Sequence, residues 1–590
     1  MNSIIDDFLV GMEIDFKGLE DFNIDLRPAF KAAWNMVNNW QSAKIGRKKL
    51  AEILTYKGFP FLHMHKTQCY DTLVKMLKQL HILESIIEKE NPDIVYLFYT
   101  YQGYYVETDM DFVVPLLRQF ANKFGFTFSI VSNRLNILRQ LYQRILNFGI
   151  SSLSTIRFFH RRFFNGLPER SNKENILFFH HGTTNMKVTD RLYRELQNQD
   201  CNSIYICSDG VLKNNGYAHA TKEGFFYTYQ EPFVDNNICA VSRRFEKRNC
   251  SVWKRLFNAK SFRQLFFYRN FDLFPVFQPV LESLFIKKFY DEIRIALATD
   301  KLVQDLRPKV GFLANDAIFS GHMAVYALRK NSIMSITIAP GPFADKYVNS
   351  EVNADYIFVW SDLEKENMIG YGIPREKIRI IGTDTYANLL ARFGHANKRS
   401  LRDKFQIPNN MKVILFACRF TVGKDFKKIS KLIDLLRTDR QLNNTFLIVK
   451  MHPGDISISV KQLERLFDTD NVLFVKDAPF YSLLRVSNLV ISSDKCCTSM
   501  DSIMFSVPFI IWSISDRIDE DSPCKIPFDE SIDIFVRLEG YGALTSDVLN
   551  PMLFDKQVIK KFKRLSRRYY QKHYSSLDVE VVQDFLDKRK

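Results

Sequence analysis

The stretch FLIVKMHPGD, residues 446–455, joins an apolar run to an abrupt polar end. The apolar residues are followed at once by Lys450, His452, Pro453 and Gly454. A short apolar run that ends in chain breakers predicts a strand of a parallel sheet covered on both faces. Residues just beyond the carboxyl end of such a strand face the ligand crevice of the sheet. The stretch therefore predicts a fold class and the place of a binding site.

Strands of the same kind alternate with helical patterns along most of the chain, which is typical of α/β domains with parallel sheets. We predict strands within 93–100, 126–131, 174–184, 202–210, 309–316, 332–340, 354–361, 377–385, 412–420, 445–453, 471–477, 483–494 and 506–512. The fold class that we expect is α/β, with two Rossmann-like domains facing across a cleft. The first covers 1–390 and the second 405–545, joined by a polar linker near 392–410, and a basic helical segment covers 546–590.

Composition limits the class of protein. The chain has 590 residues, 46% of them hydrophobic, and a net charge of +16, which favours an anionic partner. The acidic N-terminus lacks the pattern of a secretory signal, and no apolar run approaches the about 18 residues of a membrane span. Nine cysteines without a C-x-x-C pair argue against a disulfide framework or a zinc ribbon. We therefore expect a cytoplasmic protein.

An irregular region within the first domain, about 140–290, mixes aromatic and basic residues. The stretches RFFHRRFF (157–164) and RRFEKRNCSVWKRLF (243–257) show this most strongly. Such a pattern is found in helices that lie on a membrane surface and in grooves that bind single-stranded nucleic acid. It is equally found in helices that bury an aromatic face and leave their cations in solvent. The sequence leaves these three readings open.

Two more loops of the second domain carry groups that bind phosphate. Arg419 and Lys424 follow the strand within 412–420, and paired serines end the strand within 483–494. The helix after the serines opens with hydroxyl side chains, and hydroxyls and free N–H groups at a helix start bind anions. Asp501, one turn into that helix, is suited to accept hydrogen bonds from ribose hydroxyls. The predicted donor site consists of Arg419, Lys424, Lys450, His452, Pro453, Ser492, Ser493, Thr498, Ser499 and Asp501.

KMHPGD and ISSDKCCTS together resemble the HP and serine motifs of bacterial GT-B glycosyltransferases that make surface and capsular polysaccharide. Relatives of that group are sialyl- and Kdo-transferases and CDP-glycerol polyol-phosphate transferases. The stretch 354–390 also resembles the end of the N-terminal domain of such enzymes, and the resemblance extends over about 305–545. It implies a GT-B fold and a nucleotide donor, often linked through CMP or CDP. By resemblance, His452, Ser492, Ser493 and Thr498 contact the donor phosphate.

The chain departs from the pattern of this group in two places. Asp501 and Ser502 stand where many of these enzymes have Glu-Ala, which leaves the ribose contact open. APGPF, residues 339–343, stands where relatives often have Gln-His-Gly, which leaves the acceptor side open.

An inverting transfer needs a base that takes the proton of the acceptor hydroxyl, and the base should come from the first domain. Asp316 ends the strand within 309–316 and is the first candidate. Asp209, in CSDG, is the second, and the pair His180 and His181 is the third. Each of these side chains is equally suited to cap a helix.

Asp468-Thr469-Asp470 has the Asp-x-Asp spacing that holds a divalent ion in the other glycosyltransferase fold, but here it lies at the wrong end of its strand for that role. We expect a metal-independent enzyme without a cofactor, in which cations and helix N-termini offset the charge of the leaving group. The predicted partners are a nucleotide-sugar donor, an oligosaccharide or lipid-linked acceptor and an anionic membrane surface, and no nucleic acid is expected. Two other functions remain open: a CDP-glycerol-type polyol-phosphate transferase, and a non-catalytic basic protein that binds membrane or nucleic acid.

Overall fold

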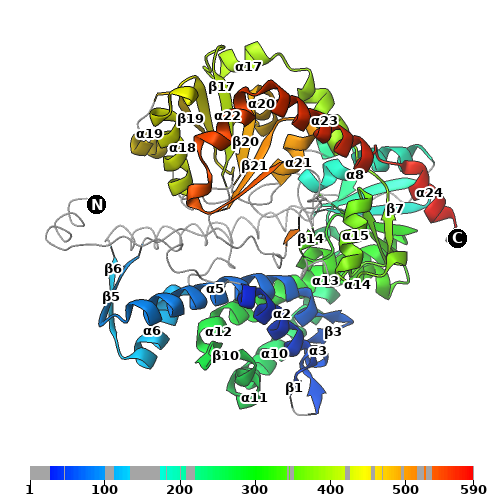
Figure 1. Cartoon of the computed structure of the whole chain (residues 1–590). Helices are drawn as coiled ribbons and strands as arrows, with labels where there is room; N and C mark the ends of the chain where they lie inside the picture. The colour runs from blue at the N-terminus through cyan, green and yellow to red at the C-terminus, as the bar shows by residue number, and fades with distance from the viewer. Residues whose placement is uncertain are drawn as a thin grey trace.

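The computed structural model describes most of the chain, shown in Figure 1. The described residues are 27–45, 47–99, 112–132, 173–180, 183–199, 201–207, 220–339, 341, 344–345, 351–418, 425–453, 459–467, 470–492, 497–513, 524–525 and 535–588. They form two α/β parts, each built on a parallel sheet, and a helical part near the N-terminus. The predicted α/β class is confirmed.

The C-terminal α/β part contains a six-stranded parallel sheet. Its strands are β17 (Lys412–Ala417), β18 (Thr445–Lys450), β19 (Val472–Val475), β20 (Leu489–Ser492), β21 (Phe509–Ser513) and β23 (Val536–Glu539). They stand in the order β19-β18-β17-β20-β21-β23. The chain therefore runs outward from β17 in one direction, returns to the centre and runs outward in the other, as in doubly wound folds. All six residues of β18 are buried; the sequence predicts this for the apolar run 446–449 but not for Lys450.

Helices cover both faces of this sheet, which explains its continuous apolar strands. Ile414 and Phe416 of β17 pack in one core with α18 (Phe426–Thr438) and α19 (Val460–Phe467). The alternate residues Val413 and Leu415 pack in a second core with α20 (Phe480–Val486). Successive side chains of a strand point to opposite faces, so each strand contributes to both cores. The helix α21 (Cys497–Met504) follows β20.

The N-terminal α/β part contains a seven-stranded parallel sheet with the same kind of order. Its strands are β7 (Asn175–His180), β8 (Asn202–Cys207), β9 (Tyr227–Thr228), β12 (Val310–Leu313), β13 (Met334–Ile338), β15 (Tyr356–Val359) and β16 (Ile378–Ile380). They stand in the order β16-β15-β13-β12-β7-β8-β9. The direction of winding reverses between β7 and β12, at the centre of the sheet. The main helices beside it are α8 (Thr183–Asn198), α13 (Phe289–Leu306), α14 (Phe319–Lys330) and α15 (Asp362–Gly370).

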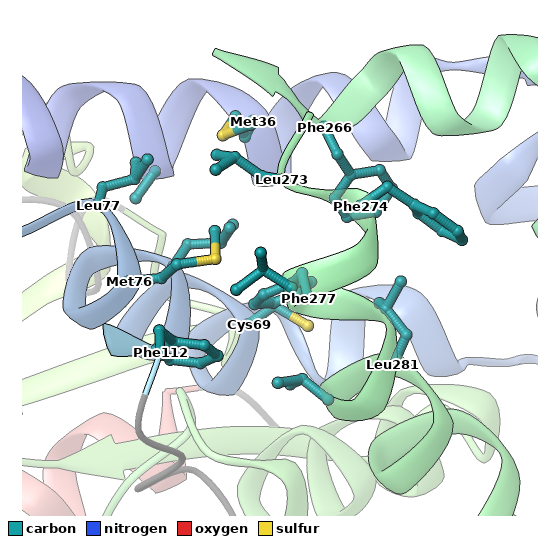
Figure 2. Packing of buried hydrophobic residues seen from close by; sticks show 14 of the residues in the cluster. Met36, Cys69, Met76, Leu77, Phe112, Phe266, Leu273, Phe274, Phe277 and Leu281 are labelled. Atoms are coloured by element: carbon teal, nitrogen blue, oxygen red, sulfur yellow. The ribbon is translucent and has the colours of Figure 1, made fainter. Parts of the chain in front are cut away.

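A helical part packs beside this sheet and is built from two distant segments of the chain. Its helices α2 (Arg27–Ser42), α5 (Lys66–Glu90) and α6 (Val113–Phe124) share one core with α10 (Asn236–Asn258) and α12 (Phe274–Glu282). Figure 2 shows Met36, Cys69 and Leu77 facing Leu273, Phe277 and Leu281 across this core. The predicted strands near 93–100 and 126–131 exist as β5 (Ile94–Tyr99) and β6 (Thr127–Ser132). They pair only with each other among the described strands, so they lie outside the main sheet.

The segments that lie outside the seven-stranded sheet therefore do not coincide with the insertion expected at about 140–290. Strands β7 and β8 fall within those numbers but occupy the centre and one side of the seven-stranded sheet. In the basic and aromatic stretch 243–257, which lies on α10, Val252, Trp253 and Leu256 are buried. This part of the stretch buries an apolar face and leaves cations exposed. The similar stretch 157–164 lies outside the described residues.

Two segments connect the α/β parts. The first contains η7 (Leu390–Gly394) and α17 (Lys398–Lys404), so the expected polar linker is largely helical. The second is the C-terminal segment, with α22 (Ser546–Phe554), α23 (Lys556–His573) and α24 (Val579–Asp587). In Figure 1, α23 runs from the C-terminal part to the N-terminal part, where α24 packs. The N–H of Asp578 donates to the carbonyl of Ile381 at 2.7 Å and secures this return.

A short strand pair joins loops of the two α/β parts. β14 (Ala344–Asp345) pairs antiparallel with β22 (Cys524–Lys525). β14 follows the carboxyl end of β13, and β22 follows the carboxyl end of β21. The segments that leave the carboxyl edges of the two sheets therefore meet. None of the helices in the described ranges has the length and apolar character needed to cross a membrane.

Candidate functional site

The carboxyl edge of the C-terminal sheet brings together the ends of the three strands that precede the predicted loops. Ala417, at the end of β17, is in register with Lys450 of β18 and with Ser492 of β20. Since neighbouring strands lie about 4.8 Å apart, Lys450 and Ser492 are separated by about 10 Å across β17. The winding of the sheet reverses between β17 and β20, and ligands of doubly wound sheets bind at such a point. Ser492 therefore lies at the topological switch point of this sheet, with Lys450 one strand beyond Ala417.

His452 follows β18 at this edge and is exposed, as is Pro453. Met451 between Lys450 and His452 is fully buried, and its N–H donates to the carbonyl of Val475 at 2.8 Å. The strand thus keeps its alternation for one residue beyond β18, which turns Met451 into the core and His452 outward. Pro453 restricts His452 to extended backbone. The imidazole therefore has the position and the exposure that a phosphate ligand needs.

Lys450 has contacts of a different kind from those predicted. It is buried, and its Nζ donates to the carbonyl oxygens of Met451 at 2.7 Å and Lys476 at 2.6 Å. Burial lowers the pKa of its ammonium group. The side chain thus ties the end of β18 to the residue that follows β19. These contacts describe a residue that holds the strand ends together, and its contact with a donor stays a prediction.

The serine loop reaches the same edge from β20. Ser492 is buried at the end of the strand, and Ser499 is buried in the first turn of α21. Thr498 is partly exposed, and its carbonyl accepts a hydrogen bond from the Ser502 hydroxyl at 2.7 Å. Hydroxyl groups thus surround the start of a helix that points its N-terminus toward the switch point. This arrangement is suited to an anion.

Asp501 has a contact of a different kind from the one predicted. Its carboxyl group is buried, and the Tyr481 hydroxyl lies 3.4 Å from its Oδ1. Tyr481 belongs to α20 and stacks between Phe393 of η7 and Phe505. Burial raises the pKa of Asp501 to about 7, and the hydrogen bond from Tyr481 opposes this shift. These contacts place the carboxyl group of Asp501 against α20, which packs on η7 in the segment that connects the two α/β parts. They give no support to the predicted ribose contact, which stays a prediction.

A buried ion pair supports the first turn of α18, immediately after the predicted phosphate loop at 419–424. Asp425 and Lys428 are both buried, with their charged atoms 4.0 Å apart. Lys428 also donates to the carbonyl of Trp512 at 2.7 Å, at the end of β21. The pair anchors the start of α18 to the edge of the sheet. The sequence shows these residues only as one acid and one base at helical spacing, which is a frequent pattern.

The carboxyl edge of the N-terminal sheet contains the candidates for the catalytic base. Leu313, at the end of β12, is in register with Phe179 of β7, so the residues after both strands lie at the switch point of this sheet. Asp316 follows β12 and His180 ends β7. Both residues therefore lie at or just beyond the carboxyl edge of this sheet. His181 and Asp209 lie outside the described residues.

The carboxyl group of Asp316 is buried and accepts hydrogen bonds from backbone N–H groups. Its Oδ2 accepts hydrogen bonds from the N–H groups of Asn353 and Ala354, each at 2.8 Å. Burial raises the pKa of Asp316, and these hydrogen bonds partly oppose the rise. A carboxyl group so engaged holds the segment before β15 in place. Its action as a base stays a prediction, since the contacts point to a structural role.

His180 is also buried. Its Nε2 lies 2.9 Å from the Thr189 hydroxyl of α8, and its ring stacks with that of Phe178. Burial lowers the pKa of His180 to about 3, so the imidazole is neutral near pH 7. Its contacts pack it beneath α8.

A polar network that sequence reasoning missed lies beside Asp316. The amide oxygen of Asn353 accepts a hydrogen bond from His63 Nε2 at 2.8 Å, and its amide nitrogen donates to His322 Nε2 at 2.8 Å. His322 is buried in the first turn of α14, and its Nδ1 donates to the carbonyl of Met64 at 3.0 Å. Burial lowers the pKa of His322 to about 3. The network joins the helical part to the N-terminal sheet. The paired histidines of FLHMHK (61–66) are its only signal in the sequence.

The remaining predicted residues are not among those that the structure describes. Arg419, Lys424 and Ser493 lie outside the described ranges, as do Asp468 and Thr469 of the Asp-x-Asp stretch before β19. Within the described ranges, no three His, Cys, Asp or Glu side chains are grouped so that they could hold a metal ion.

Comparisons with known proteins give a limited likeness in sequence and a broader one in fold. No family model matches the chain. It is 27% identical over 146 residues to the teichoic acid glycerol-phosphate primase of Bacillus spizizenii, which covers 25% of this chain and 34% of the primase. The chain thus matches about a third of the length of this curated relative.

Solved structures with a similar arrangement are glycosyltransferases and nucleotide-sugar epimerases. A glycosyltransferase from Rickettsia africae is 14% identical, with a TM-score of 0.44, covering 71% of this chain and 99% of that one. The UDP-GlcNAc 2-epimerase from Neisseria meningitidis, bound to UDP-GlcNAc, is 12% identical, with a TM-score of 0.42, covering 68% and 99%. The glycotransferase of kitacinnamycin is 13% identical, with a TM-score of 0.42, covering 71% and 99%.

Proposed function

We propose that this chain is a metal-independent GT-B glycosyltransferase that takes a sugar from a nucleotide donor, linked through CMP or CDP. The acceptor in this proposal is a growing surface glycan or a lipid-linked saccharide at the inner face of the cytoplasmic membrane. The observation that carries the proposal is the switch point of the C-terminal sheet. There the exposed His452, the Ser492 end of β20 and the hydroxyl-rich start of α21 share one edge.

The chemistry of that edge suits a nucleotide leaving group. Departure of a nucleoside mono- or diphosphate leaves negative charge on phosphate oxygens. An imidazole, hydroxyl groups and a helix N-terminus can all donate hydrogen bonds to such oxygens. Arg419 and Lys424 follow β17 in the sequence, and we include them in the proposed donor site.

The proposed acceptor side is the edge of the N-terminal sheet, because the β14–β22 pair brings the loops of the two edges together. Asp316 and His180 are occupied by structural contacts. The proposed base is therefore one of the two other candidates, His181 or Asp209, each of which follows a strand of that sheet. Replacement of each by Asn or Ala, with transfer measured at saturating donor, separates them.

A second function has specific support. The likeness to a glycerol-phosphate primase favours a transferase that moves a polyol phosphate from CDP-glycerol. Such an enzyme would use the same phosphate-binding groups, but the transferred unit would keep one phosphate. A non-catalytic basic protein on the same frame is the third reading.

Thermal unfolding with added nucleotides tests the proposal. Under both enzymatic proposals, CMP or CDP should raise the unfolding temperature more than UDP does, since a ligand that binds only the folded state stabilises it. Product analysis with CMP-linked sugars and with CDP-glycerol then distinguishes a glycosyl from a glycerophosphoryl transfer. Absence of stabilisation by every nucleotide, together with salt-dependent binding to RNA or DNA, would support the non-catalytic reading.

A further inference from the structure

The helix α23 carries a dense positive surface that the proposed reaction does not use. Eight of its 18 residues are Lys or Arg, and the helix contains no Asp or Glu. All eight are exposed. They are Lys556, Lys560, Lys561, Lys563, Arg564, Arg567, Arg568 and Lys572, and we call them the α23 cationic face.

The packing of α23 fixes the direction of this face. Phe562, Ser566, Tyr569 and His573 are buried, and they recur every three to four residues along the helix. This stripe lies against the C-terminal part, where Tyr569 shares a core with Met500 and Ile503 of α21. A helix that buries one stripe presents the opposite half of its circumference to solvent. The cations therefore project outward along the outside of the molecule, where Figure 1 shows α23.

Among the described residues, few acids pair with these cations. For seven of the eight cations, all but Lys561, no carboxylate partner is seen among the described residues. Like charges so close repel one another, which destabilises the folded protein unless a partner offsets the repulsion. Such a surface is therefore typical of a binding site for an extended anion.

Neighbouring elements extend the positive surface. Lys563 of α23 and Arg485 of α20 both lie near Lys398 of α17. The Nε of Arg485 also donates to the carbonyl of Ala396 at 3.3 Å. Lys398 is an exposed residue as a whole, but its ammonium group is partly buried. This burial and the charges of Arg485 and Lys563 lower the pKa of Lys398 to about 8. Three elements that are distant in sequence thus bring cations to one side of the C-terminal part.

We propose that the α23 cationic face docks the protein on the surface of an anionic lipid bilayer. The 18 residues of the helix span about 27 Å, and all its cations lie on one half of its circumference, which matches a flat partner. Its apolar stripe is buried in the protein, so the contact is electrostatic and needs no insertion of side chains. Clusters of four to eight cations on an amphipathic helix bind anionic head groups in this way.

A bilayer fits this surface better than a nucleic acid does. Single strands bind in grooves that offer aromatic side chains to stack on the bases. Of the two tyrosines of α23, Tyr569 is buried and Tyr570 is half-buried against Tyr574. The cationic face therefore offers charge without a stacking platform. The inference goes beyond the proposed reaction and does not depend on the identity of the donor.

Sedimentation of the full chain with lipid vesicles tests this inference. We expect binding to phosphatidylcholine vesicles that contain about 30% phosphatidylglycerol and negligible binding to pure phosphatidylcholine. Binding to the anionic vesicles should fall steeply between about 50 and about 300 mM salt, because salt screens exposed charges. The variant K560Q/K563Q/R564Q/R567Q removes four charges from the face without changing its buried stripe. Its affinity for anionic vesicles should fall by about tenfold or more.

A matched control comes from α10, whose basic stretch 243–257 was the other candidate for membrane contact. The variant R243Q/R244Q/K247Q/K254Q removes the same charge from exposed positions of that helix and should bind vesicles like the wild type. Thermal unfolding of both variants checks that the fold is kept. Three results would overturn the inference: an equal loss of vesicle affinity in both variants, unchanged binding of the α23 variant, or vesicle binding that does not change with salt concentration. Tighter binding to a single-stranded oligonucleotide than to anionic vesicles, lost in the α23 variant, would assign the face to nucleic acid instead.

Discussion

The Tyr481 hydroxyl lies 3.4 Å from Oδ1 of Asp501, in a buried contact between α20 and α21. Both helices follow strands of the sheet at whose carboxyl edge the donor is proposed to bind, and Tyr481 contacts the carboxyl group of Asp501. Burial raises the pKa of Asp501 to about 7. The side chain therefore titrates near neutral pH and affects stability in a way that can be measured.

Replacing Asp501 by Asn should stabilise the protein above pH 7. Because the folded-state pKa is raised, the unfolded chain loses its proton first as the pH rises from about 4, and the wild type loses stability until the pH passes about 7. Asn keeps the shape without this loss. The gain in unfolding free energy should grow from near zero at pH 4 to at most about 4 kcal/mol at pH 8. Urea unfolding of both proteins across this range measures it.

The exposed carboxylate of Asp434 on α18 provides the control for Asp501. Asp434→Asn should change stability by less than about 0.5 kcal/mol at every pH. A destabilised Asp501→Asn protein at pH 8 would contradict the assignment. If that variant instead lost nucleotide affinity at unchanged stability, the predicted ribose contact would be favoured.

Lys450 should matter for stability more than for donor binding. Its Nζ donates to the carbonyls of Met451 and Lys476, so Lys450→Met leaves one buried and one partly buried acceptor without this donor. We expect a loss of about 2–4 kcal/mol in unfolding free energy. The exposed Lys461 of α19 serves as control, since Lys461→Met should be nearly neutral. A Lys450→Met protein with wild-type stability and weak nucleotide binding would restore the donor role first predicted.

The strands of the C-terminal sheet could be predicted because each is a local feature. An apolar run that ends in Pro or Gly, as at 446–454, needs no knowledge of its neighbours. The direction of Lys450 could not be predicted, because one of its acceptors is the carbonyl of Lys476 on the next loop. Lys450 and His452, two residues apart on the same strand, differ in their surroundings because the first is buried and the second exposed.

The first domain was harder to predict for a related reason. The runs at 94–99 and 127–132 have the pattern of sheet strands, and they form a parallel pair. Whether such a pair joins a larger sheet depends on which helices pack beside it. That packing is determined by the core that α2 and α5 share with α12, a contact between residues about 200 positions apart. The network of His63, Asn353 and His322 is equally non-local.

Gly321 should be needed to position the loop that contains Asp316. A Cβ at Gly321 would lie 1.9 Å from the carbonyl oxygen of Asn315, so α14 can pack this close to the loop only with glycine. Gly321→Ala must move the loop or the helix, and we expect a loss of about 1–3 kcal/mol in unfolding free energy. Gly370→Ala is the matched control, since no atom lies within 4 Å of the added Cβ at that helical position. Denaturant unfolding compares the two, and equal stability of both variants would contradict the close approach.

The central claim is that His452 and the hydroxyl groups after β20 hold the phosphate of the donor at one edge of the sheet. Calorimetric titration with CDP and with cytidine tests this claim most directly, on the wild type, His452→Ala and the exposed control His395→Ala. Loss of a hydrogen bond to a charged phosphate should weaken CDP binding by about tenfold or more, while cytidine binding and the control stay unchanged. Equal affinity of the wild type and His452→Ala for CDP, with the phosphates adding nothing over cytidine, would contradict the account.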